Sequence, residues 1–421
     1  MIENRNDNNI IPFPQRENDI IDKNWKVRFW AVFIGQALSL VGSSLTQFVL
    51  LWWITDTTGS VSALATAGMA ALLPQALLSP LGGTFADRYS RRNLMLVADS
   101  ISALCMVLLI VLFLTGRIEI WHAYIMMSIR GAMQAFQGPA SAASVAMLVP
   151  KSFLSRASGL NQTLQAFTTV ASAPLGALAI SIMPIGWALS IDVITAVMAI
   201  LPLLYFVIPQ PKVDKDRISN VWNEFLEGIK LVWNDRGLLR LYTLMACVVL
   251  IIMPAFTFLP LLIKTYFGGG ASQVALMEGL AGIGMVAGGL IIVAIAPKRQ
   301  VIWILSGFAV SCFTMAFTAL TPASLFWLAT TFWVLSGIFF IMGNAPLTAL
   351  LQTTIPNHLQ GRALSLLNMI MGLAAPVGLA LATPLGELIG IRGLFVAMGL
   401  LGGIICLVGY FSRSIKQLDS E

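Results

Sequence analysis

Apolar runs of about twenty residues recur along this 421-residue chain and constrain its fold more than any other feature. A backbone inside a lipid bilayer has no water to bind, so each run must satisfy its own peptide groups as an α-helix. The sequence therefore predicts an all-α membrane protein with twelve transmembrane helices in two pseudo-symmetric six-helix bundles. The runs lie near residues 27–55, 61–86, 93–114, 120–149, 158–182, 186–208, 237–263, 273–296, 301–319, 324–352, 363–388 and 393–411.

The basic residues indicate how the chain is oriented in the membrane. If the N-terminus is cytoplasmic, the inner segments hold 21 of the 25 Lys and Arg. The outer loops hold only Arg117, Lys264 and Arg392, and Arg130 lies inside a span. Such an excess marks the cytoplasmic side. We therefore expect a multi-pass protein of the cytoplasmic membrane with both termini inside. The net charge of +6 then reflects this orientation and does not indicate nucleic-acid binding.

The run pattern divides the chain into five parts. Residues 1–26 are expected to be a disordered cytoplasmic tail, 27–208 the first bundle, 209–236 a cytoplasmic linker, 237–411 the second bundle and 412–421 a second tail. Within the linker, apolar residues recur at helical spacing from Trp222 to Trp233. This pattern predicts an amphipathic helix on the inner membrane surface, with a helix that binds a partner protein as the alternative. We expect a monomer surrounded by membrane lipid.

Two short patterns occur once in each half of the chain. VPKSFLSRA, residues 149–157, and IPNHLQGRA, residues 355–363, each place a proline six residues before an Arg-Ala pair. Two glycines followed by two bases also recur, first at 82–83 and 91–92 and then at 288–289 and 298–299. Two matches at equivalent loops predict a duplicated six-helix unit, which is a common plan of transporters.

The segment GGTFADRYSRR, residues 82–92, lies between two apolar runs and is called the latch loop below. Its glycines allow helix ends to approach closely, and arginines or the amides of a helix start can bind Asp87. The pattern G-x-x-x-D-R-x-x-R-R resembles the signature loop between helices 2 and 3 of the major facilitator superfamily, which often has glycine in place of Ser90. The alternative is a loop that is basic only because it is cytoplasmic. The resemblance implies a conformational latch formed by Gly83, Asp87, Arg88, Arg91 and Arg92.

Four ionisable residues lie deep inside predicted spans, namely Asp99, Arg130, Asp192 and Glu278. Each costs about 2.5–3.5 kcal/mol at a helix centre, so each should face the protein interior. All four are candidates for proton coupling. Asp99 lies only seven positions after Arg92, so a structural partnership with the latch loop is an equal alternative. Asp192 and Arg130 lie in the outer half of one bundle and can pair, either for coupling or as a permanent neutral pair needed for folding.

Three helices of the first bundle present polar residues at helical spacing. Such residues line a wet cavity or bond neighbouring helices to each other, and three stripes in one bundle favour the cavity. The second bundle has fewer polar residues and more aromatic ones. The candidates for a substrate cavity are Gln36, Ser39, Ser43, Gln47, Gln134, Gln137, Asn161, Gln165, Asn344 and Asn368.

No segment has the spacing of a hydrolytic, redox, nucleotide or metal site. The two histidines lie at helix ends, and the four cysteines lie inside apolar runs without pairing or ligand spacing. We therefore expect no enzyme activity, no cofactor and no metal.

Further segments narrow the resemblance to one branch of the superfamily. GQALSLVGSSLTQ at 35–47, Arg130 in the fourth span, IDVITA at 191–196 and FLEGIKLVWNDRGL at 225–238 resemble the drug–proton antiporters that include macrolide efflux proteins. The resemblance covers almost the whole chain. It implies secondary active export of amphiphilic, macrolide-like drugs by alternating access, in exchange for protons.

One departure bears on proton exchange more than on transport. Antiporters often carry G-x-x-x-G-P-x-x-G-G in the fifth helix, whereas TVASAPLGAL at 169–178 keeps only Pro174 and an offset Gly176. The alternative function is an exporter or flippase of a physiological cargo, such as a siderophore or a lysophospholipid.

Overall fold

The computed structural model describes residues 25–208, 233, 235–355, 357–417 and 419, and over these residues it contains helices and no strands. In chain order the helices are α1 (Trp25–Thr58), α2 (Val61–Arg88), α3 (Arg91–Leu114), α4 (Ile120–Leu148), α5 (Lys151–Ile182), α6 (Ile185–Ala188), α7 (Ser190–Tyr205), α9 (Arg236–Thr265), α10 (Ala271–Ile295), α11 (Gln300–Leu320), α12 (Phe326–Thr354), α13 (Asn357–Gly409) and α14 (Arg413–Gln417). The predicted tail before Trp25 and nearly all of the predicted linker lie outside the described residues.

Ten helical segments of the described chain are long and apolar enough to cross a membrane. They include residues 185–205 as one segment and residues 366–409 as another. Gly390 interrupts α13 with a φ of 74° and a ψ of 163°, a conformation that no α-helix contains. The predicted count of twelve therefore depends on dividing α13 at Gly390 and on counting α4, which has 29 residues, as a span.

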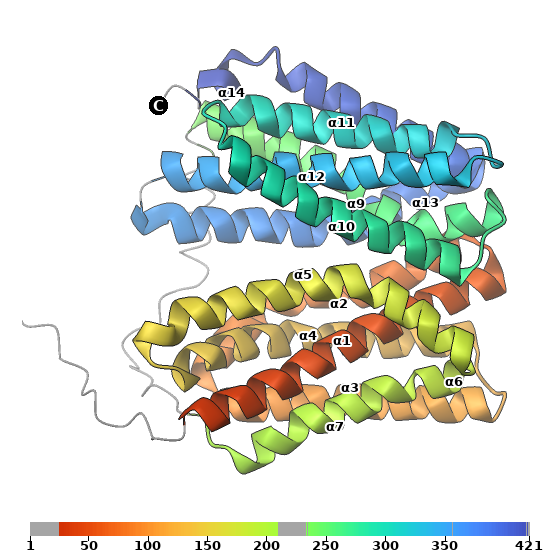
Figure 1. Ribbon diagram of the computed structural model, residues 1–421, viewed down its shortest axis with the longest axis vertical. Coiled ribbons are helices and arrows are strands. Elements are labelled where there is room, and N and C mark those ends of the chain that lie inside the picture. The colour runs from red at the N-terminus through yellow and green to blue at the C-terminus, as the bar shows by residue number, and fades with distance from the viewer. Residues whose placement is uncertain (1–24, 209–232, 234, 356, 418, 420–421) are drawn as a thin grey trace, which may run out of the picture.

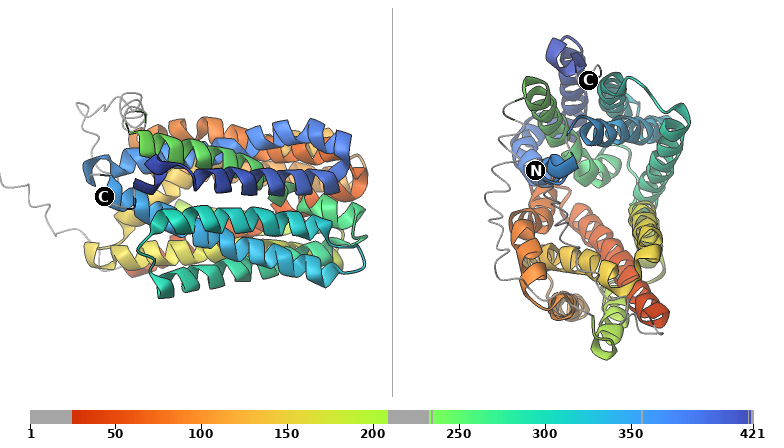
Figure 2. Two further views of the ribbon diagram at one scale, coloured as in Figure 1. Left: turned by 90° about the horizontal axis from the view of Figure 1, so that it is seen from above. Right: turned by 90° about the vertical axis from the view of Figure 1, so that its left-hand side faces the viewer.

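The helices form two bundles that lie side by side with their long axes roughly parallel (Figure 1). Helices α1 to α7 make the first bundle and α9 to α14 the second, and the view along the helices separates them clearly (Figure 2). We call the end where α1 begins and α2 ends the basic end, because Arg88, Arg91 and Arg92 lie there. The opposite end, where α1 ends and α2 begins, is the far end.

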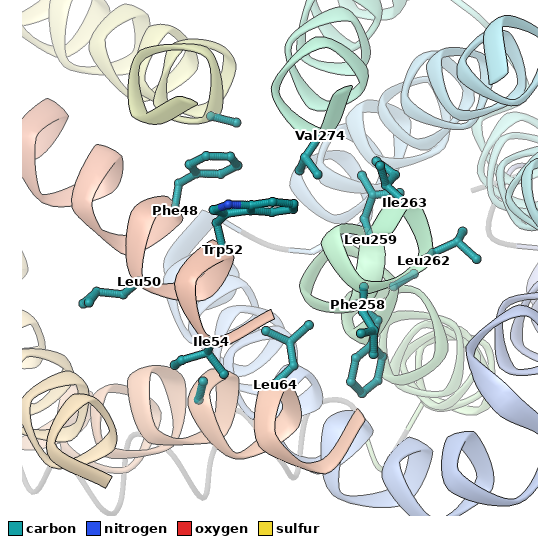
Figure 3. Close-up of a cluster of buried hydrophobic side chains, with 14 of the residues drawn as sticks. Phe48, Leu50, Trp52, Ile54, Leu64, Phe258, Leu259, Leu262, Ile263 and Val274 are labelled. Carbon is teal, nitrogen blue, oxygen red and sulfur yellow. The ribbon is translucent and has the colours of Figure 1, made fainter. Parts of the chain in front are cut away.

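Buried apolar side chains show where the two bundles meet. One cluster contains residues of both bundles and lies toward the far end, whereas two others lie toward the basic end, each inside a single bundle. In the shared cluster, Phe48, Trp52 and Leu64 of the first bundle face Leu259, Ile263 and Val274 of the second (Figure 3). The bundles therefore share a core only toward the far end.

A charged contact also crosses between the bundles at the far end. Lys264, in the last turn of α9, donates to the Asp56 carboxylate at 2.8 Å and to the backbone carbonyls of Thr55 and Asp56 near the end of α1. Because the Asp56 side chain is 59% exposed, this pair contributes at most about 1 kcal/mol. The apolar cluster is the stronger of the two contacts.

The packing of two glycines agrees with a duplicated unit. A Cβ on Gly82 of α2 would overlap the carbonyl oxygen of Ala135 on α4. A Cβ on Gly288 of α10 would lie 2.5 Å from the carbonyl oxygen of Ile338 on α12. In both bundles the second long helix thus approaches the backbone of the fourth through a glycine, as the paired sequence patterns suggested.

The orientation of the bundles in the membrane remains a prediction, and labelling tests it. Arg117 is exposed between α3 and α4 at the far end, and Lys215 lies in the segment that links the bundles. In a chain without native cysteines, Arg117→Cys should react with an impermeant maleimide in intact cells. Lys215→Cys should react only after permeabilisation, because the bases mark the cytoplasmic side. The reverse pattern would invert the topology.

Candidate functional site

Arg130 and Asp192 form an ion pair inside the first bundle. Arg130, on α4, donates from Nη2 to Oδ2 of Asp192 at 2.8 Å, and Ser43, on α1, donates to the other carboxylate oxygen at 2.8 Å. Asp192 is only 3% exposed. The second terminal nitrogen of Arg130, Nη1, is buried and has no hydrogen-bond partner among the described residues. Each oxygen of the Asp192 carboxylate therefore accepts one hydrogen bond, whereas the guanidinium keeps a terminal nitrogen that donates to none of the described residues.

A close approach of α1 to α7 brings Ser43 and Asp192 together. These helices run in opposite directions and pack side by side. A Cβ on Gly35 would lie only 2.7 Å from the carbonyl oxygen of Met198, so a larger residue would push the helices apart. The glycine thus sets the spacing that the hydrogen bond from Ser43 requires.

A second polar chain leads to Asp99. Gln137, on α4, donates to Oε1 of Gln36 at 2.6 Å, and Gln36, on α1, donates from Nε2 to Oδ2 of Asp99 at 3.0 Å. Asp99 is 6% exposed. Its hydrogen bond comes from α1 and not from the latch loop.

Two cavities adjoin these polar chains. The larger, of about 160 Å³, lies between α1, α4 and α5 and extends toward the basic end as far as Phe29 and Leu148. The smaller, of about 30 Å³, lies between α1, α3, α4 and α7 and is lined by both Asp99 and Asp192. Leu40, Gln134 and Gln137 line both, so they separate the two spaces.

Most of the polar residues singled out in the first bundle line these cavities. Gln36, Gln134, Gln137, Asn161 and Gln165 line the larger one, and Ser39, Ser43, Gln134 and Gln137 line the smaller one. Gln47, Asn344 and Asn368 line neither. Sequence reasoning missed Ser102 in the smaller cavity. The signal was its spacing, because Ser102 follows Asp99 by three residues and so lies on the same helix face.

Glu278 lies apart from the other three ionisable candidates. It is half-buried on α10, in the second bundle, and makes no hydrogen bond or ion pair with any described residue. Gly279 and Gly282, its neighbours along α10, pack against Pro174 and Val170 of α5. Glu278 is therefore close to the contact between the bundles.

Two arginines of the latch loop bond to backbone carbonyls of their own bundle. Arg91 donates to Ala143 on α4 at 3.0 Å, and Arg92 donates to Leu203 and to Leu204 on α7, the latter at 2.8 Å. Gly83 faces open space, Arg88 is exposed, and the side chain of Asp87 lies outside the description. These bonds fix the loop to α4 and α7, and the latch itself stays a prediction.

Comparisons with known proteins agree with this architecture. A model of the Major Facilitator Superfamily matches residues 32–378. Macrolide efflux protein A of Streptococcus pyogenes is 29% identical over 94% of this chain and 98% of its own length. Multidrug efflux pump Tap of Mycobacterium tuberculosis is 22% identical over 92% of this chain and 94% of its own length.

Solved transporters share the fold at low sequence identity. A bacterial homolog to the human lysosomal transporter Spinster, in an inward-facing and unoccupied conformation, matches with a TM-score of 0.64 and 16% identity over 94% of each chain. The nucleoside transporter NupG matches with a TM-score of 0.67 and 11% identity over 90% of this chain and 98% of its own. These likenesses concern the fold alone.

The latch is tested by removing its one acid. Asp87→Asn keeps the volume but removes the charge, so expression should survive while the state open at the basic end gains population about fivefold or more. Accessibility of a cysteine at the basic end and transport in the same cells measure this, and transport should fall. The matched control is Glu387→Gln. It is the same kind of change at an exposed acid that lies near Gly390, at the far end of the molecule. Full transport by Asp87→Asn at wild-type abundance would rule the latch out.

The Arg130–Asp192 pair is tested by single and double neutralisation. Asp192→Asn leaves a buried guanidinium without its counter-charge, and breaking a buried pair in this way costs about 3–5 kcal/mol. We expect lower abundance and a lower unfolding temperature in detergent. Adding Arg130→Gln should restore much of both, because neither charge then remains. If Asp192→Asn instead keeps wild-type stability and loses only transport driven by a pH gradient, the pair serves coupling and not folding.

Proposed function

Because the chain belongs to the Major Facilitator Superfamily, we propose that it is a secondary active exporter of amphiphilic small molecules, including macrolide-like drugs, that works by alternating access in exchange for protons. The observation that carries this proposal is the division of the buried clusters. The bundles share a core toward the far end and have separate cores toward the basic end. This is the packing expected of one of the two states between which a transporter alternates.

The relatives support drug export as the activity. Similarity to a macrolide efflux protein extends over 94% of the chain, so it includes both bundles and the cavities between their helices. A multidrug efflux pump matches over a comparable length. Nothing in these relatives favours the siderophore or lysophospholipid cargo, and drug export is therefore the better proposal.

The lining of the larger cavity suits an amphiphilic molecule. Gln134, Gln137 and Asn161 supply amides, and Phe29 and Phe33 supply aromatic surface. Its volume of about 160 Å³ is below the roughly 300–1,000 Å³ of a drug-sized pocket. We infer that it forms one part of a larger site that the second bundle completes.

The second bundle offers an aromatic surface for that role. Phe256, on α9, packs edge-to-face against Trp333 and Phe340 of α12, with ring centroids 5.5 and 6.3 Å apart. A substrate held between amides on one side and aromatic rings on the other would be amphiphilic. This arrangement accounts for the uneven distribution of polar residues between the two halves of the sequence.

The proposed orientation places the basic end in the cytoplasm. The state described here, with its bundles joined toward the far end, would then face inward and accept substrate from the cytoplasm or the inner leaflet. Protons entering from outside would drive the return, and the ionisable residues Asp99, Arg130, Asp192 and Glu278 are the candidates that couple the two movements.

A drug-susceptibility and accumulation panel in an efflux-deficient bacterial host tests the proposal. Expression should raise the inhibitory concentration of macrolides several-fold and lower their accumulation, and a protonophore should abolish both effects. The Asp87→Asn variant, at equal membrane abundance, is the matched control with impaired transport. Unchanged accumulation across the whole panel, with wild-type protein present in the membrane, would refute drug export.

A further inference from the structure

The smaller cavity of the first bundle has the size and lining of a site for water or a small cation. A cavity of roughly 10–15 Å³, on the scale of water-sized spheres, is enough for one water. This one measures about 30 Å³, so one or two waters fit. Asp99, Asp192, Ser39, Ser43 and Ser102 line it, which is more polar surface than a packing void between membrane helices requires.

The charges around this cavity do not balance when both acids are ionised. Arg130 compensates Asp192 at 2.8 Å, whereas the partner of Asp99 is the neutral amide of Gln36. One negative charge is therefore left on a side chain that is 6% exposed, inside a membrane-spanning helix. An isolated buried charge is costly there, so the site needs one positive charge to become neutral.

The hydrogen bonds indicate which cation the site takes. Of the four carboxylate oxygens at the cavity, three already accept a hydrogen bond, from Gln36, Ser43 and Arg130. The remaining one, Oδ1 of Asp99, has no hydrogen-bond donor among the described residues. Hard metal cations collect about six oxygen ligands, whereas a proton needs only one. Oδ1 of Asp99 can therefore bind a proton without displacing any hydrogen bond among the described residues.

We propose that Asp99 is the residue that binds the transported proton, and that the Arg130–Asp192 pair beside it stays ionised. This inference rests on the proposed function. A hydronium ion in the cavity transfers its proton to Oδ1, forming an O–H bond and leaving water, and the reverse step returns the proton to water on the other side of the membrane. Only Asp99 changes charge in this scheme.

Gln137 and Gln36 are positioning residues that connect this site to the larger cavity. Gln137 lines both cavities and holds the carbonyl of Gln36, so that the amide nitrogen of Gln36 points at Asp99. A substrate that fills the larger cavity contacts Gln137 and thereby changes the hydrogen bond that Asp99 receives. Binding of drug and binding of a proton are linked through this chain of two amides.

Of the residues that the structure describes, Asp99 and Asp192 are the charged ones that line this cavity. Asp192 is paired with Arg130, and Cys105 lies about two turns beyond Asp99 along α3. The remaining titratable side chains on α1, α2, α3, α4 and α7 lie toward one end of the bundle. Among the described side chains, those toward the far end are Asp56, His122 and Tyr124, and those toward the basic end are Lys26, Arg28, Arg88, Arg91, Arg92 and Tyr205.

Infrared difference spectroscopy on the full-length protein in lipid tests the proton site without any substrate. Wild type should show a protonated-carboxyl band that titrates with pH, and Asp99→Asn should lack it. Asp192→Asn with Arg130→Gln, which removes the neighbouring pair, should keep it. Gln36→Leu, which removes the hydrogen bond to Asp99, should move the titration away from its wild-type position and serves as a second variant if Asp99→Asn is unstable.

A second measurement links the proton to transport, with erythromycin as the probe. Wild type should release protons when erythromycin binds, and Asp99→Asn should bind the drug with an affinity that no longer depends on pH.

An Asp99→Asn variant with a wild-type carboxyl band, or with wild-type proton release, overturns the assignment. Export driven by a sodium gradient and lost in Asp99→Asn also overturns it, because the cation would then be Na⁺. Failure of wild type to bind erythromycin would count against the proposed function alone, because the infrared titration still decides the role of Asp99.

Discussion

The apolar contact between the two bundles at the far end determines which state this molecule is in. Within a membrane, helices gain little from the hydrophobic effect when they associate, because lipid is as apolar as their side chains. The cluster around Trp52 and Leu259 is therefore stabilised by packing, with a weak contribution from Lys264 and Asp56. A contact of this kind holds the bundles together without locking them. Alternating access requires this, because both states must lie within a few kcal/mol of each other.

The two bundles are unequal although their packing is similar. Gly82 and Gly288 occupy equivalent places, yet the ion pair, the two buried acids with hydrogen-bonded partners and both polar cavities belong to the first bundle. The second bundle supplies aromatic contacts such as Phe256 with Trp333. Duplication therefore explains the shared scaffold, and later divergence explains why charge is concentrated in the first bundle.

The sequence predicted the helices well because bilayer thickness limits them directly. The runs at 61–86 and 120–149 correspond to α2, Val61–Arg88, and α4, Ile120–Leu148. It predicted that Arg130, Asp192 and Asp99 face the interior because a charged side chain is costly inside a membrane. It did not predict that Asp99 bonds to Gln36, because hydropathy does not fix the rotation of one helix against another. Close approaches such as that of Gly35 to Met198 set this rotation, and they appear only in three dimensions.

If Asp99 is the proton site that we propose, the charge balance of the first bundle explains how one proton can control a movement of the whole molecule. With Asp99 protonated, the buried groups carry no net charge, since Arg130 and Asp192 cancel. With Asp99 ionised, one uncompensated charge remains beside a cavity of about 30 Å³, where one or two waters must solvate it. A conformation that excludes those waters favours the neutral form, and one that admits more water favours the ionised form. The ion pair thus makes the bundle sensitive to a single proton, because without Arg130 two negative charges would remain and one proton would not neutralise the site.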